Sequence, residues 1–380
     1  MVEKKNLKTW VEIDKSTIQK NYETFRSLLS QDTKLMAVVK SNAYGHDLVQ
    51  FSQEMEKSGI DFLGVDSIEE ALELRENNIQ SLILVFGYVP KFFYQKAIDQ
   101  KIILTISNFE ALKNCIEFKD VVIHIEVDTN LGRQGFLTKN QEDVLEIIKN
   151  NNLKVEGLYT HFAVAEDPQQ LDFTKGQVSE FQKWVDSFKQ AGISPMLHTS
   201  ASAETIRSNE FHFDMVRVGI GMYGLWPSKE IKEYLAVRSS FGSRTAKQIT
   251  IQLHPVLSWK TIISEIKELP SGYNIGYDLT EVLKRDSKIA VCPIGYWHGY
   301  PRSLSKIGEV MVKGKKARVL GRISMDMIVI DITDISDAKV GDEVSLIDMD
   351  INVDELAQKA GTINYEIVTR INPQIPRFYK

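Results

Sequence analysis

Short apolar segments recur through the first 225 residues, and segments of mixed polarity separate them. The mixed segments carry apolar residues at helical spacing, as in Ile68–Asn77, Asn108–Phe118 and Asp172–Ala191. Strands that alternate with helices in this way are typical of βαβ units, and eight such units close into a (β/α)8 TIM-type barrel. The eight predicted strands are Leu35–Val39, Phe62–Val65, Leu82–Phe86, Ile102–Ile106, Val121–Val127, Val155–Tyr159, Met196–His198 and Met215–Val218.

The pattern changes after about Thr245, where short strands follow one another with turn-rich segments between them. Only Val353–Ala360 has the spacing of a helix there. We therefore expect an α/β barrel domain over residues 1–244 and a mostly antiparallel β domain over residues 245–380, with the early strand Thr9–Ile13 packed in the second domain. The strands predicted for the β domain are Leu257–Lys267, Lys288–Pro293, Glu309–Val312, Arg318–Val319, Met327–Ile332 and Glu343–Ile347.

Composition narrows the possible partners of the chain. Its 380 residues are 43% hydrophobic and 26% charged, with a formal net charge of -5. This charge offers no basic field for nucleic acid or an anionic membrane. The polar start of the sequence predicts no signal peptide, and no apolar run is long enough to span a bilayer. The widely separated Cys115 and Cys292 are typical of core thiols in a reducing compartment, so we expect a cytoplasmic protein.

Four polar residues occupy the ends of predicted strands, namely Lys40, His161, Ser202 and Arg217. Active sites of (β/α)8 barrels lie at the carboxyl ends of the strands, so these side chains are candidates for one site. A lysine at the end of an apolar strand is costly because desolvation disfavours the ammonium, but the neutral amine is the form that attacks a carbonyl carbon. The alternative is a lysine that extends from a strand end to water.

Residues 219–224, Gly-Ile-Gly-Met-Tyr-Gly, match the G-x-G-x-x-G pattern of dinucleotide-binding proteins. That pattern belongs to an early βαβ unit, whereas here seven units precede it and Pro227 follows closely. Barrels commonly bind phosphate with the loops after strands seven and eight, where Ser202, Gly219 and Ile220 fall. The pattern thus favours a phosphate-bearing cofactor of another type. No metal-binding motif is present, so no metal is expected.

The segment from Ala37 to His46 resembles the lysine-bearing segment of bacterial alanine racemases, which use pyridoxal 5'-phosphate (PLP) on a barrel. The resemblance covers nearly the whole chain. It implies that Lys40 carries PLP, that Arg217 faces the pyridine nitrogen, and that His161 packs behind Arg217. Taken alone, His161 would be interpreted as a hydrogen-bonded core imidazole. The positions that match phosphate contacts of the family are Tyr44, Ser202, Gly219, Ile220 and Tyr365.

Arg217 has a mechanistic consequence in this interpretation. An arginine keeps its proton at physiological pH, so it leaves the pyridine nitrogen as a neutral acceptor. PLP is then a weaker electron sink than it is opposite an aspartate, which suits removal and return of one proton. A barrel decarboxylase of similar architecture would need an acidic group at this position.

Racemisation needs two proton-transfer groups, one on each face of the substrate. The resemblance assigns these roles to Lys40 and to Tyr277, which lies in a segment similar to the tyrosine-base segment of the family. A phenol is a poor base at neutral pH unless positive charge assists it, and the expected helpers are Arg217 and His161. In the family this tyrosine comes from the partner subunit, which implies a head-to-tail homodimer. Without the resemblance, Tyr277 would be taken for a turn residue.

The expected substrate-binding residues are Arg133, Met325 and Tyr296, with Asp326 beside Met325. Arg133 matches the arginine that binds the substrate carboxylate, a role that suits a guanidinium fork. Met325 matches a residue that meets the same carboxylate from the partner chain, and Tyr296 matches a tyrosine of the substrate entryway.

The sequence departs from the family at three places. Glu126 stands where many relatives carry a carbamylated lysine, and we expect its carboxylate to orient Arg133 directly; the alternative is a strand residue that faces solvent. Trp297-His298 replaces a small-acidic pair after the entryway tyrosine, and Asp278 replaces a common glycine.

The resemblance as a whole predicts an alanine racemase that supplies D-alanine for peptidoglycan. A racemase of serine or a larger amino acid and a PLP-binding protein without turnover are the alternatives.

Overall fold

The computed structural model describes residues 4–118, 120–240 and 251–380. The chain divides into two compact units. One unit comprises Ser16–Ala43 and Leu48–His254, and the other comprises Met1–Lys15, Tyr44–Asp47 and Pro255–Lys380. The expected domain boundary between residues 244 and 245 lies outside the described residues.

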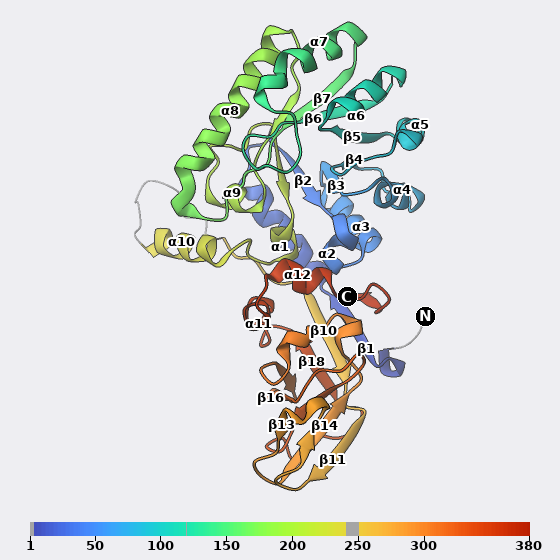
Figure 1. The fold of residues 1–380 in the computed structure, drawn as a ribbon, viewed down its shortest axis with the longest axis vertical. Helices are drawn as coiled ribbons and strands as arrows, with labels where there is room; N and C mark the ends of the chain where they lie inside the picture. The colour runs from blue at the N-terminus through green and yellow to red at the C-terminus, as the bar shows by residue number, and fades with distance from the viewer. Residues whose placement is uncertain (1–3, 119, 241–250) are drawn as a thin grey trace. The chain divides into compact units, whose positions relative to one another are not determined.

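The first unit is a closed barrel of eight parallel strands (Figure 1). Each strand pairs with the next along the chain, and β2 closes the barrel by pairing with β9, so that Met36 lies opposite Arg217. The predicted (β/α)8 barrel is confirmed, and the predicted strand ends differ from the observed ones by one residue at most. The strands are β2 (Lys34–Val38), β3 (Phe62–Val65), β4 (Leu82–Val85), β5 (Ile102–Ile106), β6 (Val122–Glu126), β7 (Lys154–Tyr159), β8 (Met196–His198) and β9 (Met215–Val218).

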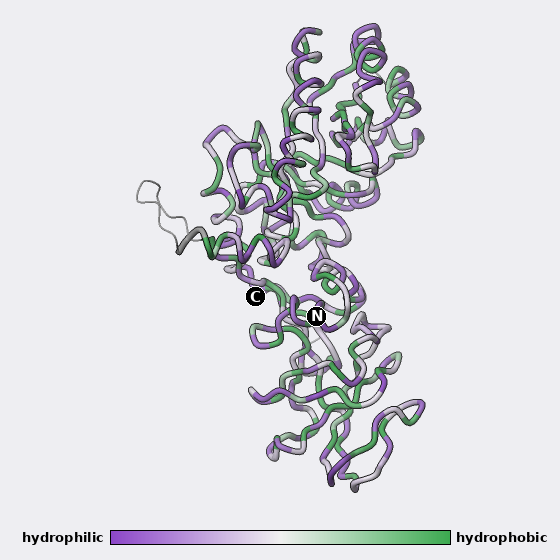
Figure 2. Tube along the Cα trace, turned by 60° about the vertical axis from the view of Figure 1, so that its left-hand side comes forward, coloured by the Kyte–Doolittle hydropathy of each residue, from purple (hydrophilic) through white to green (hydrophobic). Residues whose placement is uncertain are grey.

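Helices connect these strands because their apolar residues recur on one face. In α8 (Leu171–Gln190), Phe181, Trp184 and Phe188 are buried at a spacing that matches the helical repeat. Figure 2 shows the resulting alternation of hydrophobic and hydrophilic stretches along the chain. The other helices are α1 (Lys15–Ser27), α3 (Leu48–Ser58), α4 (Ile68–Glu76), α5 (Tyr94–Asp99), α6 (Phe109–Asn114), α7 (Gln141–Asn151), α9 (Ser202–Arg207) and α10 (Lys229–Ser240).

Side-chain caps fix where two of these helices begin. The Ser67 side chain accepts a hydrogen bond from the Glu70 N–H before α4, and the Asn108 side chain accepts one from the Ala111 N–H before α6. Such caps satisfy backbone donors that have no partner within the helix. The turn after β3 therefore ends where α4 begins, and the turn after β5 ends where α6 begins. Both caps help to fix the carboxyl ends of these two strands.

The second unit is built on a nine-stranded sheet, in the order β11-β14-β17-β16-β15-β18-β10-β1-β19. The sheet is antiparallel except where β1 and β19 pair, and β1 lies between β10 and β19. The mostly antiparallel domain is confirmed. Its strands are β1 (Thr9–Ile13), β10 (Leu257–Ile262), β11 (Glu265–Leu269), β14 (Ser287–Cys292), β15 (Glu309–Val312), β16 (Lys315–Leu320), β17 (Ile328–Asp331), β18 (Glu343–Ile347) and β19 (Arg377–Tyr379).

Two details of the predicted β domain are wrong. The segment Leu257–Lys267 is two strands rather than one, because the chain turns at Ile263 and Ser264, where the Ser264 N–H donates to the Val291 carbonyl. A second helix, α12 (Asn364–Thr369), follows α11 (Val353–Ala360). It is too short for apolar periodicity to reveal it.

Candidate active site

Lys40 follows the end of β2 and begins α2 (Lys40–Gly45). Its ammonium nitrogen lies 3.5 Å from Asp66 Oδ1, and Asp66 directly follows β3. The Lys40 side chain is 38% exposed, so it is reachable at the carboxyl edge of the barrel. Sequence reasoning missed Asp66, although its position at the end of a neighbouring strand was a usable signal.

The residues after Lys40 form a left-handed turn. Ser41, Asn42, Ala43 and Tyr44 have φ angles of 56°, 55°, 50° and 51°. Left-handed backbone costs roughly 1–2 kcal/mol for each residue other than glycine, so four in a row must be held by their surroundings. The Ala43 N–H donates to the Val39 carbonyl at 2.8 Å. Strain of this kind gathers at functional sites, and here it lies next to the candidate lysine.

Side-chain hydrogen bonds hold the same turn in place. The Asn42 N–H donates to Glu70 Oε1 at 3.2 Å, and Asn42 Oδ1 accepts from the Leu48 N–H at 2.9 Å. The other carboxylate oxygen of Glu70 accepts from the Asp66 N–H at 2.9 Å. Glu70 therefore ties the segment after β2 to the segment after β3, which fixes Lys40 and Asp66 relative to each other.

Arg217 lies in β9 and is only 4% exposed. Its Nη1 donates to His198 Nδ1 and to the His198 carbonyl, both at 2.9 Å. Its Nη2 donates to the carbonyls of Thr160 at 2.8 Å and Thr199 at 2.9 Å. These four acceptors occupy the four Nη–H groups. The Nε–H is then the one guanidinium donor with no acceptor among the described residues.

Burial lowers the pKa of Arg217 to about 10, while the nearby Tyr159 and Glu126 oppose this shift and Arg133 adds to it. The group remains a cation at neutral pH. Its guanidinium carbon lies 5.1 Å from the centre of the Tyr159 ring, which suits a cation–π contact.

His161 is held near Arg217 after β7. Its Nδ1 lies 3.4 Å from Arg217 Nη2. Burial, together with the positive charges of Arg217, Arg133 and Lys40, lowers the pKa of His161 to about 3. The imidazole is therefore neutral at physiological pH, and three predicted site residues act on it electrostatically.

Ser202, Gly219 and Ile220 come together where α9 and β9 meet. The buried Ser202 Oγ accepts hydrogen bonds from the N–H groups of Gly219 at 3.0 Å and Gly221 at 3.4 Å. Its own hydroxyl hydrogen has no acceptor among the described residues. A Cβ on Gly221 would lie 2.4 Å from the Phe25 ring, so this position requires glycine. A small backbone loop with an outward hydroxyl donor fits a phosphate group.

Glu126 is the last residue of β6 and is buried. Its Oε2 accepts hydrogen bonds from the Tyr159 hydroxyl at 3.0 Å and from Gln134 Nε2, while Oε1 lies 4.0 Å from Arg133 Nη2. Burial raises the pKa of Glu126, although Gln134, Tyr159 and Arg133 oppose the shift. Glu126 is therefore no solvent-facing strand residue. Sequence reasoning missed Tyr159 and Gln134, and the alternation of side chains along β7 was the only signal for Tyr159.

Tyr44 and Tyr365 belong to the other unit, in which their ring centres lie 6.1 Å apart. Tyr44 is half-buried, and burial raises its pKa above the ordinary value. Two hydroxyl groups predicted to bind phosphate are thus brought to one place although they come from opposite ends of the sequence.

Tyr277 lies on the exposed tip between the short strands β12 (Asn274–Ile275) and β13 (Glu281–Val282). Its side chain is 65% exposed. The next residue, Asp278, has a φ of 62°, and its Oδ2 lies 2.9 Å from Arg322 Nε. The structure thus presents Tyr277 at the surface of its own unit, on a loop that an ion pair holds.

The entryway residues lie in the same unit. The Tyr296 N–H donates to the Ser324 carbonyl at 3.2 Å, and the Trp297 N–H donates to the Met325 carbonyl at 3.0 Å. These bonds place Tyr296 beside Met325. The side chains of both residues are exposed.

The two residues that depart from the family at the entryway behave differently. Trp297 is 58% exposed, whereas His298 is buried. His298 Nδ1 accepts from the Gly295 N–H at 3.2 Å and lies 3.9 Å from Asp326 Oδ1. His298 therefore supports the loop, and Trp297 is the residue that can contact a substrate.

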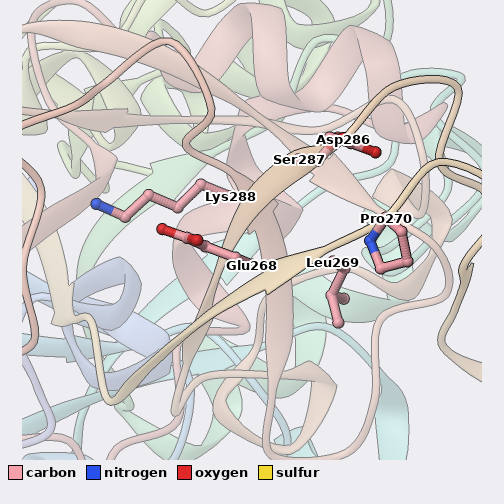
Figure 3. Close-up of a pocket in the computed structure, with 6 residues that line it drawn as sticks. All are labelled: Glu268, Leu269, Pro270, Asp286, Ser287 and Lys288. Atoms are coloured by element: carbon pink, nitrogen blue, oxygen red, sulfur yellow. The ribbon is translucent and has the colours of Figure 1, made fainter.

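The β domain also contains an open hollow of about 370 Å³ between β11 and β14 (Figure 3). Two of its charged groups already have partners. Lys288 Nζ donates to the Ala338 carbonyl at 3.2 Å, and Asp286 Oδ1 accepts from the Ser271 N–H at 2.9 Å. It contains none of the predicted site residues. Its lining residues are Glu268, Leu269, Pro270, Asp286, Ser287 and Lys288.

The described residues have two further properties that bear on the site. They contain no group of three or more His, Cys, Asp or Glu side chains arranged to bind a metal ion. Among helices in the same part of the chain, none has the length and apolar character needed to cross a membrane.

Comparison with known proteins gives a consistent result over the whole chain. Residues 13–227 match the family model "Alanine racemase, N-terminal domain", and residues 256–379 match "Alanine racemase, C-terminal domain". The alanine racemase of Halothermothrix orenii is 39% identical over 383 aligned positions, covering 98% of this chain and 97% of that protein.

Solved structures agree with the sequence comparison. Alanine racemase from Clostridium difficile 630 has a TM-score of 0.90 at 31% identity, covering 99% of this chain and 96% of that chain. The Bacillus anthracis enzyme with bound L-Ala-P has a TM-score of 0.89 at 34% identity, covering 98% and 95%. The Bartonella henselae enzyme with covalently bound pyridoxal phosphate has a TM-score of 0.85 at 25% identity, covering 98% and 100%.

Proposed function

Because the chain belongs to the alanine racemase family, we propose that it is a PLP-dependent isomerase that interconverts L- and D-alanine. Its product would supply D-alanine for peptidoglycan. The observation that carries the proposal is the Arg217 guanidinium, which uses both Nη atoms on protein acceptors and keeps Nε–H for another group.

The residues of the barrel fit PLP. Lys40 Nζ would be the amine for covalent attachment, and the Ser202 hydroxyl, whose oxygen is held by the Gly219 N–H, would bind the phosphate beside the loop at Gly219 and Ile220. The family resemblance also assigns Tyr44 and Tyr365 to the phosphate, and within their own unit the two rings lie 6.1 Å apart. When bound, PLP withdraws electron density from the α-carbon of the substrate and makes its proton removable.

In this proposal Arg217 sets the strength of that electron withdrawal. A guanidinium with a pKa of about 10 remains protonated at neutral pH, so its Nε–H would donate to the ring nitrogen of bound PLP without transferring the proton. His161, neutral because its pKa is lowered, adds no second positive charge behind Arg217. This arrangement favours return of the proton over side reactions.

Two groups exchange the α-proton. Lys40 Nζ serves one face, and the hydroxyl of Tyr277 of the partner subunit serves the other. The exposure of Tyr277 supports a head-to-tail homodimer, because a base that is 65% exposed on its own chain has room to meet a second copy. The same holds for Met325, which is 54% exposed and would meet the substrate carboxylate from the partner side.

Arg133 binds the substrate carboxylate, and Glu126 orients it. The Glu126 carboxylate is fixed by Tyr159 and Gln134, and its second oxygen points toward Arg133. An anion built into the chain at this place would perform the role of a carbamylated lysine without bicarbonate. Tyr296 would line the entryway, and Asp326 would lie beside Met325 in the segment that meets the substrate carboxylate from the partner side.

Proton NMR of the PLP-loaded protein in deuterated buffer tests the proposal. We expect loss of the α-proton signal of L-alanine, and of D-alanine, far faster than that of serine, lysine or arginine. Faster exchange with serine or a larger amino acid would keep the chemistry and change the substrate, and the exposed Trp297 would be the first residue to replace. Absence of exchange with all of them would leave a PLP-binding barrel without turnover.

A further inference from the structure

A chain of two histidines continues from Arg217 into the barrel. Arg217 Nη1 lies 2.9 Å from His198 Nδ1, and His198 Nε2 lies 3.0 Å from His124 Nδ1. His198 is in β8, His124 is in β6, and both side chains are fully buried. Neither histidine has a role in the function proposed above.

The arginine determines the tautomer of both rings. A guanidinium can only donate, so His198 Nδ1 must accept. A neutral imidazole carries one hydrogen, so His198 Nε2 holds it and donates to His124 Nδ1. The hydrogen of His124 must then be on its Nε2. Burial and the charge of Arg217 keep both rings neutral: the pKa of His124 is lowered to about 3 and that of His198 is lowered well below its ordinary value.

The far end of this chain leaves one ring nitrogen without a partner in the described part of the structure. His124 Nε2 is buried and has no hydrogen-bond partner among the described residues. A buried N–H without an acceptor is unfavourable, and a flipped tautomer would relieve it only by removing the acceptor that His198 needs. The direction of donation is therefore imposed from the Arg217 end.

Packing holds the rings in place. The Tyr159 ring stacks on His198 with centres 4.6 Å apart and planes inclined by 16°. Gly157 makes room for the other imidazole, since a Cβ there would lie 2.3 Å from His124 Nδ1. Neither ring can turn without displacing a neighbour, so the hydrogen-bond direction is fixed as well as the position.

We propose that His198 and His124 are positioning residues, which hold the guanidinium of Arg217 by a one-way hydrogen-bond relay so that Nε–H is the donor left for the cofactor ring. The inference rests on the proposed function for the identity of the group at Nε. The relay itself is a property of the protein alone. Without it, Nη1 would lose a fixed acceptor and the guanidinium could turn a different N–H toward the ring.

The relay is tested first without substrate, by long-range proton–nitrogen NMR of the holoenzyme and the apoenzyme labelled with ¹⁵N-histidine. The chain has seven histidines, and H198N and H124N assign the two signals of interest. We expect both rings to be neutral with a hydrogen on Nε2 in both forms. A hydrogen on Nδ1 of either ring would overturn the relay.

A pair of variants then tests its consequence. In H198N the amide oxygen lies near the former Nδ1 and can accept from Arg217, whereas the longer side chain in H198Q reaches toward the former Nε2 and leaves Nη1 without that acceptor. We expect H198Q to lower kcat by roughly 10- to 100-fold with KM for alanine nearly unchanged, and H198N to stay within about threefold of wild type. The absorbance spectrum of bound PLP should shift in H198Q alone.

Cys115→Ala removes a buried side chain elsewhere in the barrel and is the control for general destabilisation. Equal losses in H198N and H198Q, or a change in KM rather than kcat, would overturn the positioning role. If the wild-type protein exchanges no amino acid, the proposed function fails, and the NMR experiment still decides whether the relay exists.

Discussion

The surroundings of Arg217 and of Tyr277 represent two different ways of building a functional residue into one chain. Arg217 is 4% exposed and donates four hydrogen bonds to groups that its own unit supplies. Tyr277 is 65% exposed and lies on a tight loop whose described support is the backbone and the Asp278–Arg322 ion pair. One environment is complete within its unit, and the other is open.

The difference indicates how each residue depends on the rest of the protein. A buried group whose Nη atoms are held by protein acceptors is coupled to stability, because removing any of these partners leaves an unpaired polar atom. An exposed group on a hairpin contributes little to folding and is free to act on another surface. In the proposed homodimer, the barrel holds cofactor and substrate while the hairpin completes the site of the partner.

The largest expected effects are the loss of activity when either region is defective and its partial recovery when two chains with different defects are mixed. Lys40→Ala and Tyr277→Phe should each lower alanine racemisation at least about 1,000-fold, since each removes a proton-transfer group. If the partner subunit supplies Tyr277, a mixture refolded or co-expressed from both variants contains heterodimers with one intact site. Activity should then return to about a quarter of wild type, because half of the dimers would carry one intact site of two.

Lys34→Ala is the matched control for Lys40→Ala. Lys34 is the first residue of β2, whereas Lys40 follows the other end of this strand, and Lys34 Nζ lies 2.9 Å from Asp61 Oδ1. This control variant should retain activity. No recovery in the mixture, with dimers shown by sedimentation, would mean that Tyr277 acts within its own chain.

Two tyrosine-to-phenylalanine changes should separate the regions by stability. Tyr277→Phe should leave the midpoint of thermal unfolding unchanged while activity falls at least about 1,000-fold. Tyr159→Phe removes the donor to Glu126 Oε2 and the acceptor for the Thr105 hydroxyl, which lie 3.0 and 3.1 Å away. It should cost about 1–3 kcal/mol of unfolding free energy. Calorimetry of both holoenzymes measures the contrast, and equal stability losses would contradict it.

The same contrast explains what the sequence could predict. The barrel strands were predictable because segments such as Leu35–Val39 are apolar on both faces, a pattern that few other structures produce. The predicted residues Lys40 and Arg217 were accessible because strand ends and barrel topology place them at one edge. The turn at Ile263 and Ser264 was not predictable, since no glycine, proline, asparagine or aspartate marks it in the sequence.

Supporting residues were harder to predict than the residues they support. His198, His124 and Tyr159 are ordinary strand residues in the sequence, and only the register of β6 to β9 brings them against Arg217. Glu126 was noticed because of its departure from a known pattern, whereas Gln134 had no such signal. Contacts between residues on different strands depend on side-chain direction in three dimensions, which periodicity does not specify.

Glu126→Gln should produce a smaller effect that separates binding from folding. The KM for alanine should rise about tenfold, corresponding to about 1.4 kcal/mol, because Arg133 loses the anion that orients it. Kinetics with L-alanine at fixed PLP measure this change. An unchanged KM would mean that Glu126 does not orient Arg133.

The sign of the stability effect follows from the raised pKa of Glu126. The folded state binds this proton more tightly than the unfolded state, so its contribution is present below the ordinary pKa of 4.5 and is lost as pH rises through the raised pKa. An amide at this position cannot ionise, so Glu126→Gln should gain thermal stability relative to wild type as pH rises above that ordinary value. Glu156→Gln is the control. Burial also raises the pKa of Glu156, but no hydrogen bond links Glu156 to Arg133, so the KM of this variant for alanine should stay unchanged.

Two glycines in the same unit give an effect on stability alone. A Cβ at Gly157 would lie 2.3 Å from the imidazole of His124, whereas a Cβ at Gly176, on α8, would meet nothing within 4 Å. Gly157→Ala should therefore lower the unfolding free energy by about 1–3 kcal/mol through overpacking. Gly176→Ala should raise it by up to about 1 kcal/mol through helix propensity. Denaturant unfolding measures both, and a neutral Gly157→Ala would show that the packing around the Arg217 centre is looser than its contacts indicate.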